Sequence, residues 1–415
     1  MIQIPPAFHS RNYRLYFLGQ MISLFGTWMT TTATSWLAYR LSRSTVVLGV
    51  MSCAATIPTL ALGPIAGAFI DRADRRRLLL ITGLLSLSNA SVLAWMTLTG
   101  RVSLVAMGVS TLVQGAVTAF DMPGRLAFMA DIVEGRDAAS NAIAVNGALF
   151  SASRVAGPAV AGALIAGLGE GVCFAVDAIS YGASILSLRA MHVSARSPRR
   201  ERAQSLLAHC RSGCAYIAGA GWIRDVMIAS TVLTCSTFPF SVLMPVFAVQ
   251  RLHGGPQTLG ALLAAFGCGG TVGAVWLAMH RRAPDSYPIV IAGSSALCGC
   301  ALIMLSLIDA HWPAVACIFS AGMAMVVQVQ ASTALIQVVA HDEWRGTVMS
   351  WRTTTVIGSF SIGSLIVTRL AAAGGLTFAL SACGTSALLA TAWFLHRVRR
   401  MGAVAREETS VGVLG

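Results

Sequence analysis

Three charged side chains interrupt long apolar stretches of this sequence. They are Arg154 within residues 138–169, Asp177 within 171–188 and Arg352 within 346–368. A charge near the middle of a membrane costs at least about 2.5–3.5 kcal/mol on insertion scales, so it needs a partner or a function. A carboxyl at such a position could carry a proton. An arginine there could bind an anion, pair with an acid or act in a gate.

Each of these side chains also has a purely structural interpretation. Asp177 lies about 10 Å from the outer end of its predicted helix. It could exchange a proton with the outer solution, or it could only hydrogen-bond a neighbouring helix. Arg154 lies about 20 Å from the inner end of its helix. Arg352 could select the cargo or extend its guanidinium to the nearby interface. The residues alone leave these interpretations open.

The composition indicates that lipid surrounds most of the chain. Of its 415 residues, 56% are hydrophobic and 11% are charged, with a mean hydropathy of +0.72. A soluble domain carries about 25% charged residues. The net charge of +13 comes from arginines that flank the apolar stretches, so we expect no nucleic-acid partner. The ten cysteines show no zinc-binding spacing, so we expect neither a metal nor another cofactor.

Uncharged stretches locate the elements that must position these side chains. A membrane-spanning helix needs about 20 apolar residues. Nine uncharged stretches are long enough, at 15–39, 44–70, 78–100, 102–120, 226–250, 252–280, 286–308, 310–341 and 370–396. The three interrupted stretches raise the number to twelve. Because only helices satisfy the backbone in so many crossings, we predict an all-α integral membrane protein. Its 12 transmembrane helices should form two pseudo-symmetric six-helix bundles.

The distribution of arginine predicts the orientation in the membrane. With a cytoplasmic N-terminus, 22 arginines fall on the inner side and five on the outer side, as the preference of positive residues for the cytoplasm requires. We therefore expect both termini in the cytoplasm of a bacterium and the chain in its inner membrane. The predicted domains are an N-terminal bundle, a cytoplasmic linker with an amphipathic helix, a C-terminal bundle and a cytoplasmic tail, at 1–191, 192–223, 224–397 and 398–415.

The two predicted bundles share a repeated feature. Gly67 precedes Arg75 by eight residues, and Gly273 precedes Arg281 by the same spacing. Such repeats are typical of transporters whose binding site lies between the two halves. Leu277 in the second copy stands where the first copy has an acid, so we expect the two copies to act asymmetrically.

The segment GAFIDRADRRR, from Gly67 to Arg77, resembles the G-x-x-x-D-R-x-G-R-R signature of the major facilitator superfamily. It lies between predicted spans two and three, where that superfamily carries the signature. Asp74 stands where the superfamily often has glycine, so the turn must form without it. The resemblance implies the two-bundle transporter fold and a gate at the inner end of the bundles.

The resemblance also implies roles for the charged residues of this gate. Asp71 should face the start of span eleven near Gly346, where an anion meets the positive end of a helix dipole. Arg75 should pair with Asp121 on helix four. The other members of the predicted gate are Gly67, Arg72, Arg76 and Arg125.

Further motifs over residues 8–395 resemble the export branch of the superfamily, which includes enterobactin exporters and macrolide efflux pumps. They include Asn12-Tyr13-Arg14, Asp121-Met-Pro123-Gly-Arg125 and Arg345-Gly346-Thr-Val-Met-Ser350. In addition, Gly157, Pro158 and Gly162 resemble the antiporter motif of drug exporters. Small residues of this kind let helices pack closely.

These resemblances imply a secondary active transporter. We expect a proton-driven exporter of a drug-like compound or a siderophore that works by alternating access as a monomer. Its partners would be membrane lipid, a small-molecule cargo and protons. The alternative among transporters is an uptake permease for an organic anion. A membrane sensor or enzyme fits less well, because no zinc-protease, serine-hydrolase or nucleotide-binding motif occurs.

Overall fold

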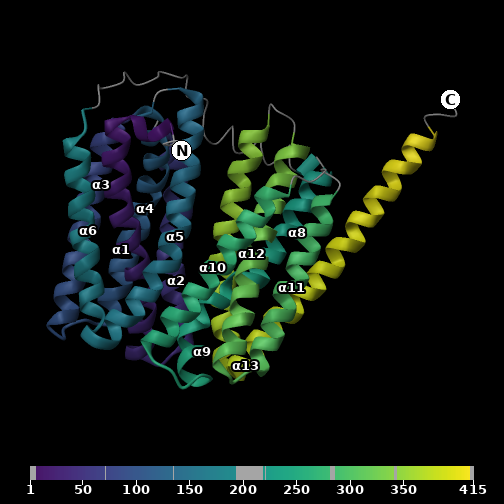
Figure 1. Ribbon diagram of the computed structural model, residues 1–415. Coiled ribbons are helices and arrows are strands. Elements are labelled where there is room, and N and C mark those ends of the chain that lie inside the picture. The colour runs from purple at the N-terminus through teal and green to yellow at the C-terminus, as the bar shows by residue number, and fades with distance from the viewer. Residues whose placement is uncertain are drawn as a thin grey trace, which may run out of the picture. The chain divides into compact units, whose positions relative to one another are not determined.

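The chain folds into a series of long helices (Figure 1). The computed structural model describes residues 6–70, 72–133, 135–192, 218–219, 221–280, 286–340 and 344–411. In chain order the helices are η1 (Pro6–His9), α1 (Arg11–Ser42), α2 (Thr45–Ile70), α3 (Arg75–Leu98), α4 (Leu104–Asp131), α5 (Arg136–Leu168), α6 (Glu170–Ala190), α8 (Gly221–Thr237), η2 (Pro239–Leu243), α9 (Met244–Gln250), α10 (Pro256–Met279), α11 (Tyr287–Leu307), α12 (His311–Val339) and α13 (Arg345–Val411).

Ten segments of the described residues are long and apolar enough to cross a membrane. The last of them, Arg345–Val398, has 54 residues, and Gly375 interrupts its helix α13 with a φ of 82°. Helix α1 has 32 residues but is not among the ten. Counting the two parts of α13 separately and adding α1 gives the twelve predicted crossings, although hydropathy alone identifies ten.

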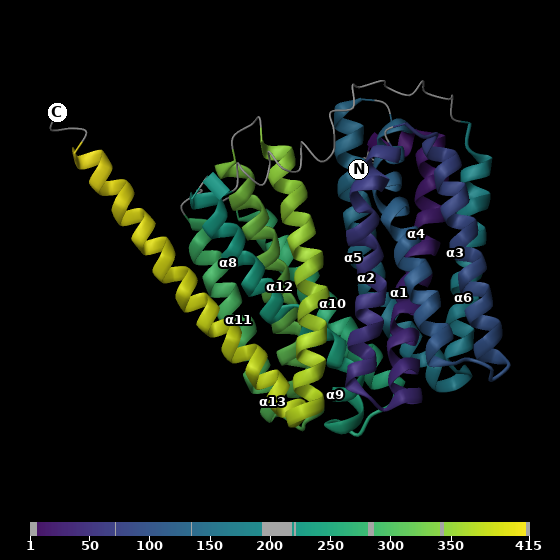
Figure 2. The ribbon, with the colours of Figure 1, turned by 180° about the vertical axis from the view of Figure 1, so that it is seen from behind.

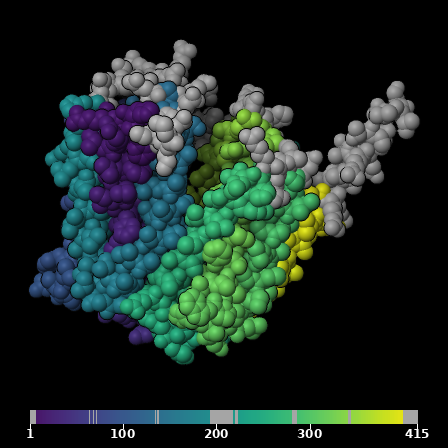
Figure 3. Space-filling model, in the orientation of Figure 1, coloured from purple at the N-terminus to yellow at the C-terminus, as the bar shows by residue number. Residues whose placement is uncertain are grey.

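The chain divides into two compact units, and the first combines Met1–Arg202 with Met244–Ala264. Within it, α1 packs against α5 and α6, α3 packs against α4 and α6, and α2 packs against α4. Figures 1 and 2 show these helices side by side, and the space-filling view shows the purple surface of α1 flanked by α5 and α6 (Figure 3). Helix α9 also contacts α1, where Gln250 Nε2 donates to the hydroxyl of Tyr39 at 3.2 Å.

Helices α1 and α6 approach closely because glycines on α1 lie opposite serines on α6. A Cβ atom at Gly19 would lie 2.2 Å from Ser187 Oγ, and one at Gly26 would lie 2.5 Å from Ser180 Oγ. Neither position has room for a larger residue, so small residues set the distance between these helices.

The second unit combines Ala203–Leu243 with Ala265–Gly415. Its core contains buried apolar side chains of α8, α11, α12 and α13, among them Leu233, Ile291 and Val348. Helix α13 continues to Val411, beyond the predicted end of the C-terminal bundle. The predicted amphipathic linker helix falls in a segment of which residues 193–217 and 220 lie outside the described part of the chain.

Candidate functional site

The loop between α2 and α3 forms its turn without glycine at position 74. Asp74 has a φ of −67° and a ψ of 106°, which any residue type can adopt. Its side chain accepts a hydrogen bond from the backbone N–H of Arg77 at 3.1 Å and so caps the start of α3. Asp71, the other acid of the signature, lies outside the described residues, and its contact near Gly346 stays a prediction.

Arg75 binds the end of α4, but through a different acid from the one predicted. Its Nη1 lies 2.8 Å from Asp131 Oδ2 and 3.3 Å from the carbonyl oxygen of Ala127. The predicted partner, Asp121, is paired with Arg125. The prediction was wrong because it ended span four at residue 120, whereas α4 continues to Asp131. That continuation brings an acid to the end of the unit where α3 begins.

Arg76 joins the start of α3 to the end of α6. Its Nε and Nη2 donate to the carbonyl oxygens of Leu188 and Arg189, each at 3.0 Å. A cation at the last carbonyls of a helix is also favoured by the helix dipole. Arg72 and Gly67 are exposed. Two arginines of the signature therefore tie α3 to α4 and to α6 within the first unit.

Asp121 and Arg125 form an ion pair one turn apart on α4, with side-chain exposures of 20% and 14%. Asp121 Oδ1 also accepts a hydrogen bond from Thr82 of α3 at 2.8 Å. Arg125 also donates to Gln20 Oε1 of α1. Because the two charges compensate each other, the pair is tolerated well inside a helix. One carboxylate and one guanidinium thus connect α1, α3 and α4.

Asp177 lies at the contact between α6 and α1. It is 2% exposed, and its Oδ1 accepts a hydrogen bond from Ser180 Oγ at 3.2 Å. The same oxygen lies only 2.7 Å from the position of a Cβ at Gly26. Among the described residues, Asp177 forms no ion pair with Arg154 or another cation. A buried carboxylate without a cation carries a large desolvation cost, which a bound proton removes.

The predicted antiporter motif lies where α5 packs against two other helices of the first unit. A Cβ at Gly157 would lie 2.6 Å from the Cβ of Trp28 on α1. A Cβ at Gly260 of α10 would lie 2.5 Å from the carbonyl oxygen of Pro158 and 3.0 Å from the Cα of Gly162. The glycines of this motif therefore permit close contacts of α5 with α1 and with α10.

The two arginines predicted inside membrane helices have different surroundings. Arg154 on α5 is half-buried. Arg352 on α13 is 1% exposed, and its three guanidinium nitrogens have no hydrogen-bond partner among the residues the structure describes. A guanidinium extended to the membrane interface would be exposed, so the structure does not support that interpretation of Arg352. Burying a charge without a partner is strongly unfavourable.

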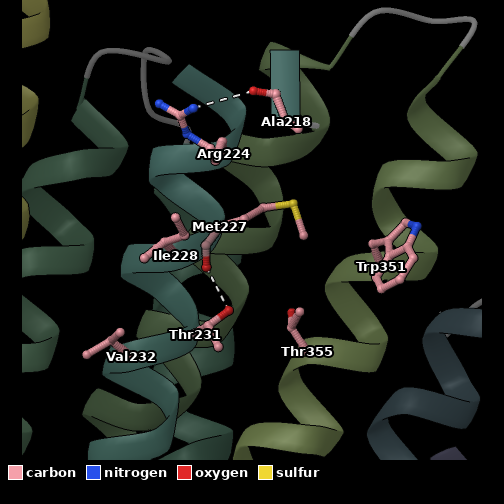
Figure 4. A pocket seen from close by; sticks show the side chains of 8 residues that line it. All are labelled: Ala218, Arg224, Met227, Ile228, Thr231, Val232, Trp351 and Thr355. Carbon is pink, nitrogen blue, oxygen red and sulfur yellow. Dashed lines mark hydrogen bonds between the residues drawn. The ribbon is translucent and has the colours of Figure 1, made fainter. Parts of the chain in front are cut away.

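A pocket of about 420 Å³ lies between α8 and α13 in the second unit (Figure 4). Its lining residues are Ala218, Arg224, Met227, Ile228, Thr231, Val232, Trp351 and Thr355. Arg224 lies at one end, where its Nη1 donates to the carbonyl oxygen of Ala218 at 3.4 Å. A wall that is mostly apolar, with one indole ring and one cation, suits an amphipathic organic molecule.

Four polar residues of the first unit were not predicted to belong to a site. They are Gln20, Thr82, Gln114 and Tyr181, on α1, α3, α4 and α6. The spacing of Gln114 and Asp121, two turns apart on α4, places both on one face of the helix. Polar residues at this spacing within an apolar stretch indicate a polar face, and this pattern could have identified Gln114 as a site residue.

Comparisons with known proteins agree with this architecture. A family model described as "Transmembrane secretion effector" matches residues 5–411. The chain is 29% identical over 280 residues to the multidrug efflux pump Tap of Mycolicibacterium fortuitum, which covers 65% of this chain and 68% of that protein. It is 22% identical over 366 residues to macrolide efflux protein A of Streptococcus pyogenes, and the match covers 86% of this chain and 89% of that protein. A staphyloferrin A transporter of Staphylococcus aureus is 23% identical over 263 residues, covering 62% and 64%.

Solved transporter structures share the fold. The nucleoside transporter NupG superimposes with a TM-score of 0.69 at 11% identity, over 94% of this chain and 98% of that chain. A bacterial homologue of the human lysosomal transporter Spinster has a TM-score of 0.64 at 12% identity, over 92% and 95%. At these identities the likeness concerns the fold alone. It confirms the predicted fold class, an all-helical membrane protein.

Proposed function

The chain belongs to the transmembrane secretion effector family of the major facilitator superfamily, and from this membership we propose that it is a proton-driven exporter of small organic molecules. The observation that carries the proposal is the family match over residues 5–411, which includes every described helix. Relatives that match most of the chain are efflux proteins. Alternating access of two helical bundles is the mechanism that this fold supports.

The cargo in this proposal is an amphipathic organic compound, either drug-like or a siderophore. The pocket between α8 and α13 supports this chemistry. Trp351 of α13 and the aliphatic side chains of α8 offer apolar contact area, and Arg224, which is paired with Asp225 at 3.4 Å, offers guanidinium hydrogen-bond donors at one end. The names of the relatives, which include drugs, macrolides and staphyloferrin A, span the same range of compounds.

The proposed location is the cytoplasmic membrane of a bacterium, with both termini in the cytoplasm. The excess of arginine on one side, 22 against five, supports this orientation. A single chain contains both units, so we propose that it works as a monomer. Two acids inside the helices of the first unit, Asp121 and Asp177, support proton coupling.

Export can be tested in a bacterium that lacks its main drug exporters. Cells that produce the chain are loaded with ethidium or erythromycin, and efflux is followed before and after addition of a protonophore. We expect efflux to be faster than in cells with an empty vector and to stop when the protonophore is added. Efflux equal to that of the vector cells for both compounds would contradict drug export. Efflux that continues after the gradient has collapsed would contradict proton drive.

A further inference from the structure

The first unit contains a column of polar side chains between α1, α3, α4 and α6. Its members are buried or half-buried, and we call them the polar column: Gln20, Ser23, Thr27, Thr82, Ser86, Asn89, Gln114, Asp121, Arg125, Asp177, Ser180 and Tyr181. Polar groups inside a membrane bundle are costly unless they bind one another or have a function. The column holds both acids that the proposed coupling requires.

One end of the polar column is organised around Tyr181 of α6. Its hydroxyl lies 3.3 Å from Thr27 Oγ1 of α1 and accepts a hydrogen bond from Gln114 Nε2 of α4 at 3.4 Å. Thr27 donates its own hydrogen to the carbonyl oxygen of Ser23 at 2.9 Å, so Tyr181 is the donor in their contact. Asp177 lies one turn before Tyr181 on the same helix. The phenol hydroxyl therefore joins three helices beside the buried acid.

The column continues along α3 to its second acid. Ser86 Oγ accepts a hydrogen bond from Gln114 Nε2 at 3.2 Å. Thr82, one turn away on the same helix, donates to Asp121 Oδ1 at 2.8 Å. One helical turn is about 5.4 Å, a distance that a single water molecule bridges with two hydrogen bonds. Hydrogen-bonding groups thus extend from the surroundings of Tyr181 to Asp121.

We propose that the polar column conducts the coupling proton between Asp177 and Asp121, with Tyr181 as the relay. This inference rests on the proposed function, since a proton path serves a proton-driven transporter. Asp177 is suited to hold the proton, because only neutral groups such as Ser180 bind its carboxyl. Asp121 is the other acid of the column; Arg125 keeps it ionised, so in this proposal it accepts the proton as its pair with Arg125 weakens.

The proposed transfer conserves protons and charge. The carboxylic acid of Asp177 releases one proton and becomes a carboxylate. The Gln114 amide donates to both Tyr181 and Ser86 and passes no proton itself, so in this path water carries the proton between their hydroxyls. Each hydroxyl or water passes on one proton as it accepts another, and one proton reaches the carboxylate of Asp121. Neutral Asp121 no longer compensates Arg125, which keeps its hydrogen bond to Gln20 of α1. Arrival of the proton therefore changes the electrostatic attraction within α4 and its contact with α1.

Polar or ionisable groups face the two acids from all four helices. Tyr16 of α1 interacts electrostatically with Asp121 and Arg125. Tyr181 of α6 interacts electrostatically with Asp177, Asp121 and Arg125. Helix α3 contributes hydroxyl and amide groups, and α4 contributes the ion pair. Tyr181 lies one turn from Asp177 on α6, and its hydroxyl binds Gln114 of α4, the helix that carries Asp121.

Tyr181→Phe tests the relay because it removes one hydroxyl and keeps the aromatic ring. In proteoliposomes, two rates are compared: exchange of ethidium without a gradient, and ethidium transport driven by a pH gradient. We expect Tyr181→Phe to lower gradient-driven transport at least tenfold and to leave exchange unchanged. The matched control is Tyr13→Phe, which loses a hydroxyl that donates to the carbonyl oxygen of Ala142 at 3.3 Å outside the column. It should change neither rate.

A second measurement needs no cargo. Infrared difference spectra of the purified protein after a pH step report which carboxyl groups gain or lose a proton. We expect one band that is lost in Asp177→Asn and another that is lost in Asp121→Asn. In Tyr181→Phe, the band of Asp121 should change at least tenfold more slowly, while the band of Asp177 is still present.

The two experiments separate the relay from the proposed function. Gradient-driven transport by Tyr181→Phe at the wild-type rate would overturn the relay and leave proton drive intact. Absence of gradient-driven transport in the wild-type protein would overturn the proposed function. In that case the infrared rates still decide the relay, because an Asp121 band that changes equally fast in wild type and Tyr181→Phe excludes it.

Discussion

Arg75 and Asp131 form a partly exposed ion pair, with 30% and 15% of their side chains accessible. Solvent screening limits such a pair to about 0.2–1 kcal/mol. We expect Arg75→Ala and Asp131→Asn each to lower the unfolding temperature slightly. The double variant should unfold at a temperature no lower than that of the less stable single variant. Thermal unfolding in detergent measures this coupling. Strictly additive losses would show that the two side chains act separately. Arg77→Ala, at an exposed neighbouring position, is the control.

Arg352 combines nearly complete burial with a guanidinium that has no hydrogen-bond partner among the described residues. Replacing buried charged groups by apolar ones of similar volume is often neutral or stabilising, by up to about 4 kcal/mol. We therefore expect Arg352→Met to unfold at an equal or higher temperature and to lose export of anionic cargo. Thermal unfolding and an efflux assay measure the two effects. A clear loss of stability would show that the arginine is satisfied in the native protein.

The contact of α5 with α10 depends on Gly260 of α10, which lies directly against the backbone of α5. A Cβ at Gly260 would lie 2.5 Å from the carbonyl oxygen of Pro158, and overpacking of this kind costs about 1–3 kcal/mol. We expect Gly260→Val to separate the two helices and reduce export strongly. Gly147→Val on α5 is the matched control, because a Cβ at Gly147 would have no described atom within 4 Å. Equal export by the two variants would show that this contact is dispensable.

Helix α4 shows why one part of the site could be predicted and another could not. Stretches without charge indicate membrane helices because hydrocarbon excludes charge, and this rule located the crossings. It failed at Asp121, because Arg125 one turn later compensates the acid and lets the helix continue to Asp131. Asp131, the partner of Arg75, lies in the part of α4 that the rule did not include, so the sequence analysis missed it.

At the scale of the whole molecule, the fold was predictable and most contacts between helices were not. Two bundles of membrane helices follow from span number, signature position and repeated spacing. In a soluble helix an apolar stripe marks the buried face, but lipid and protein core are equally apolar, so the stripe is missing here. Tyr181 and Thr82 could therefore not be assigned to one column before the neighbours of α3 and α6 were known.

The glycine–serine contacts of α1 and α6 have a mechanical consequence. Gly19 faces Ser187, and Gly26 faces Ser180 about two turns away. If α1 slid along α6 by one residue, a larger side chain would come to lie where each glycine now makes its close contact. The two helices should therefore move together as one rigid body. Spin labels on exposed positions of α1 and α6 should keep the same distance distribution at every pH and with or without ethidium. Whatever opens and closes this transporter must then bend or shift at other joints and carry this pair along as a single moving part.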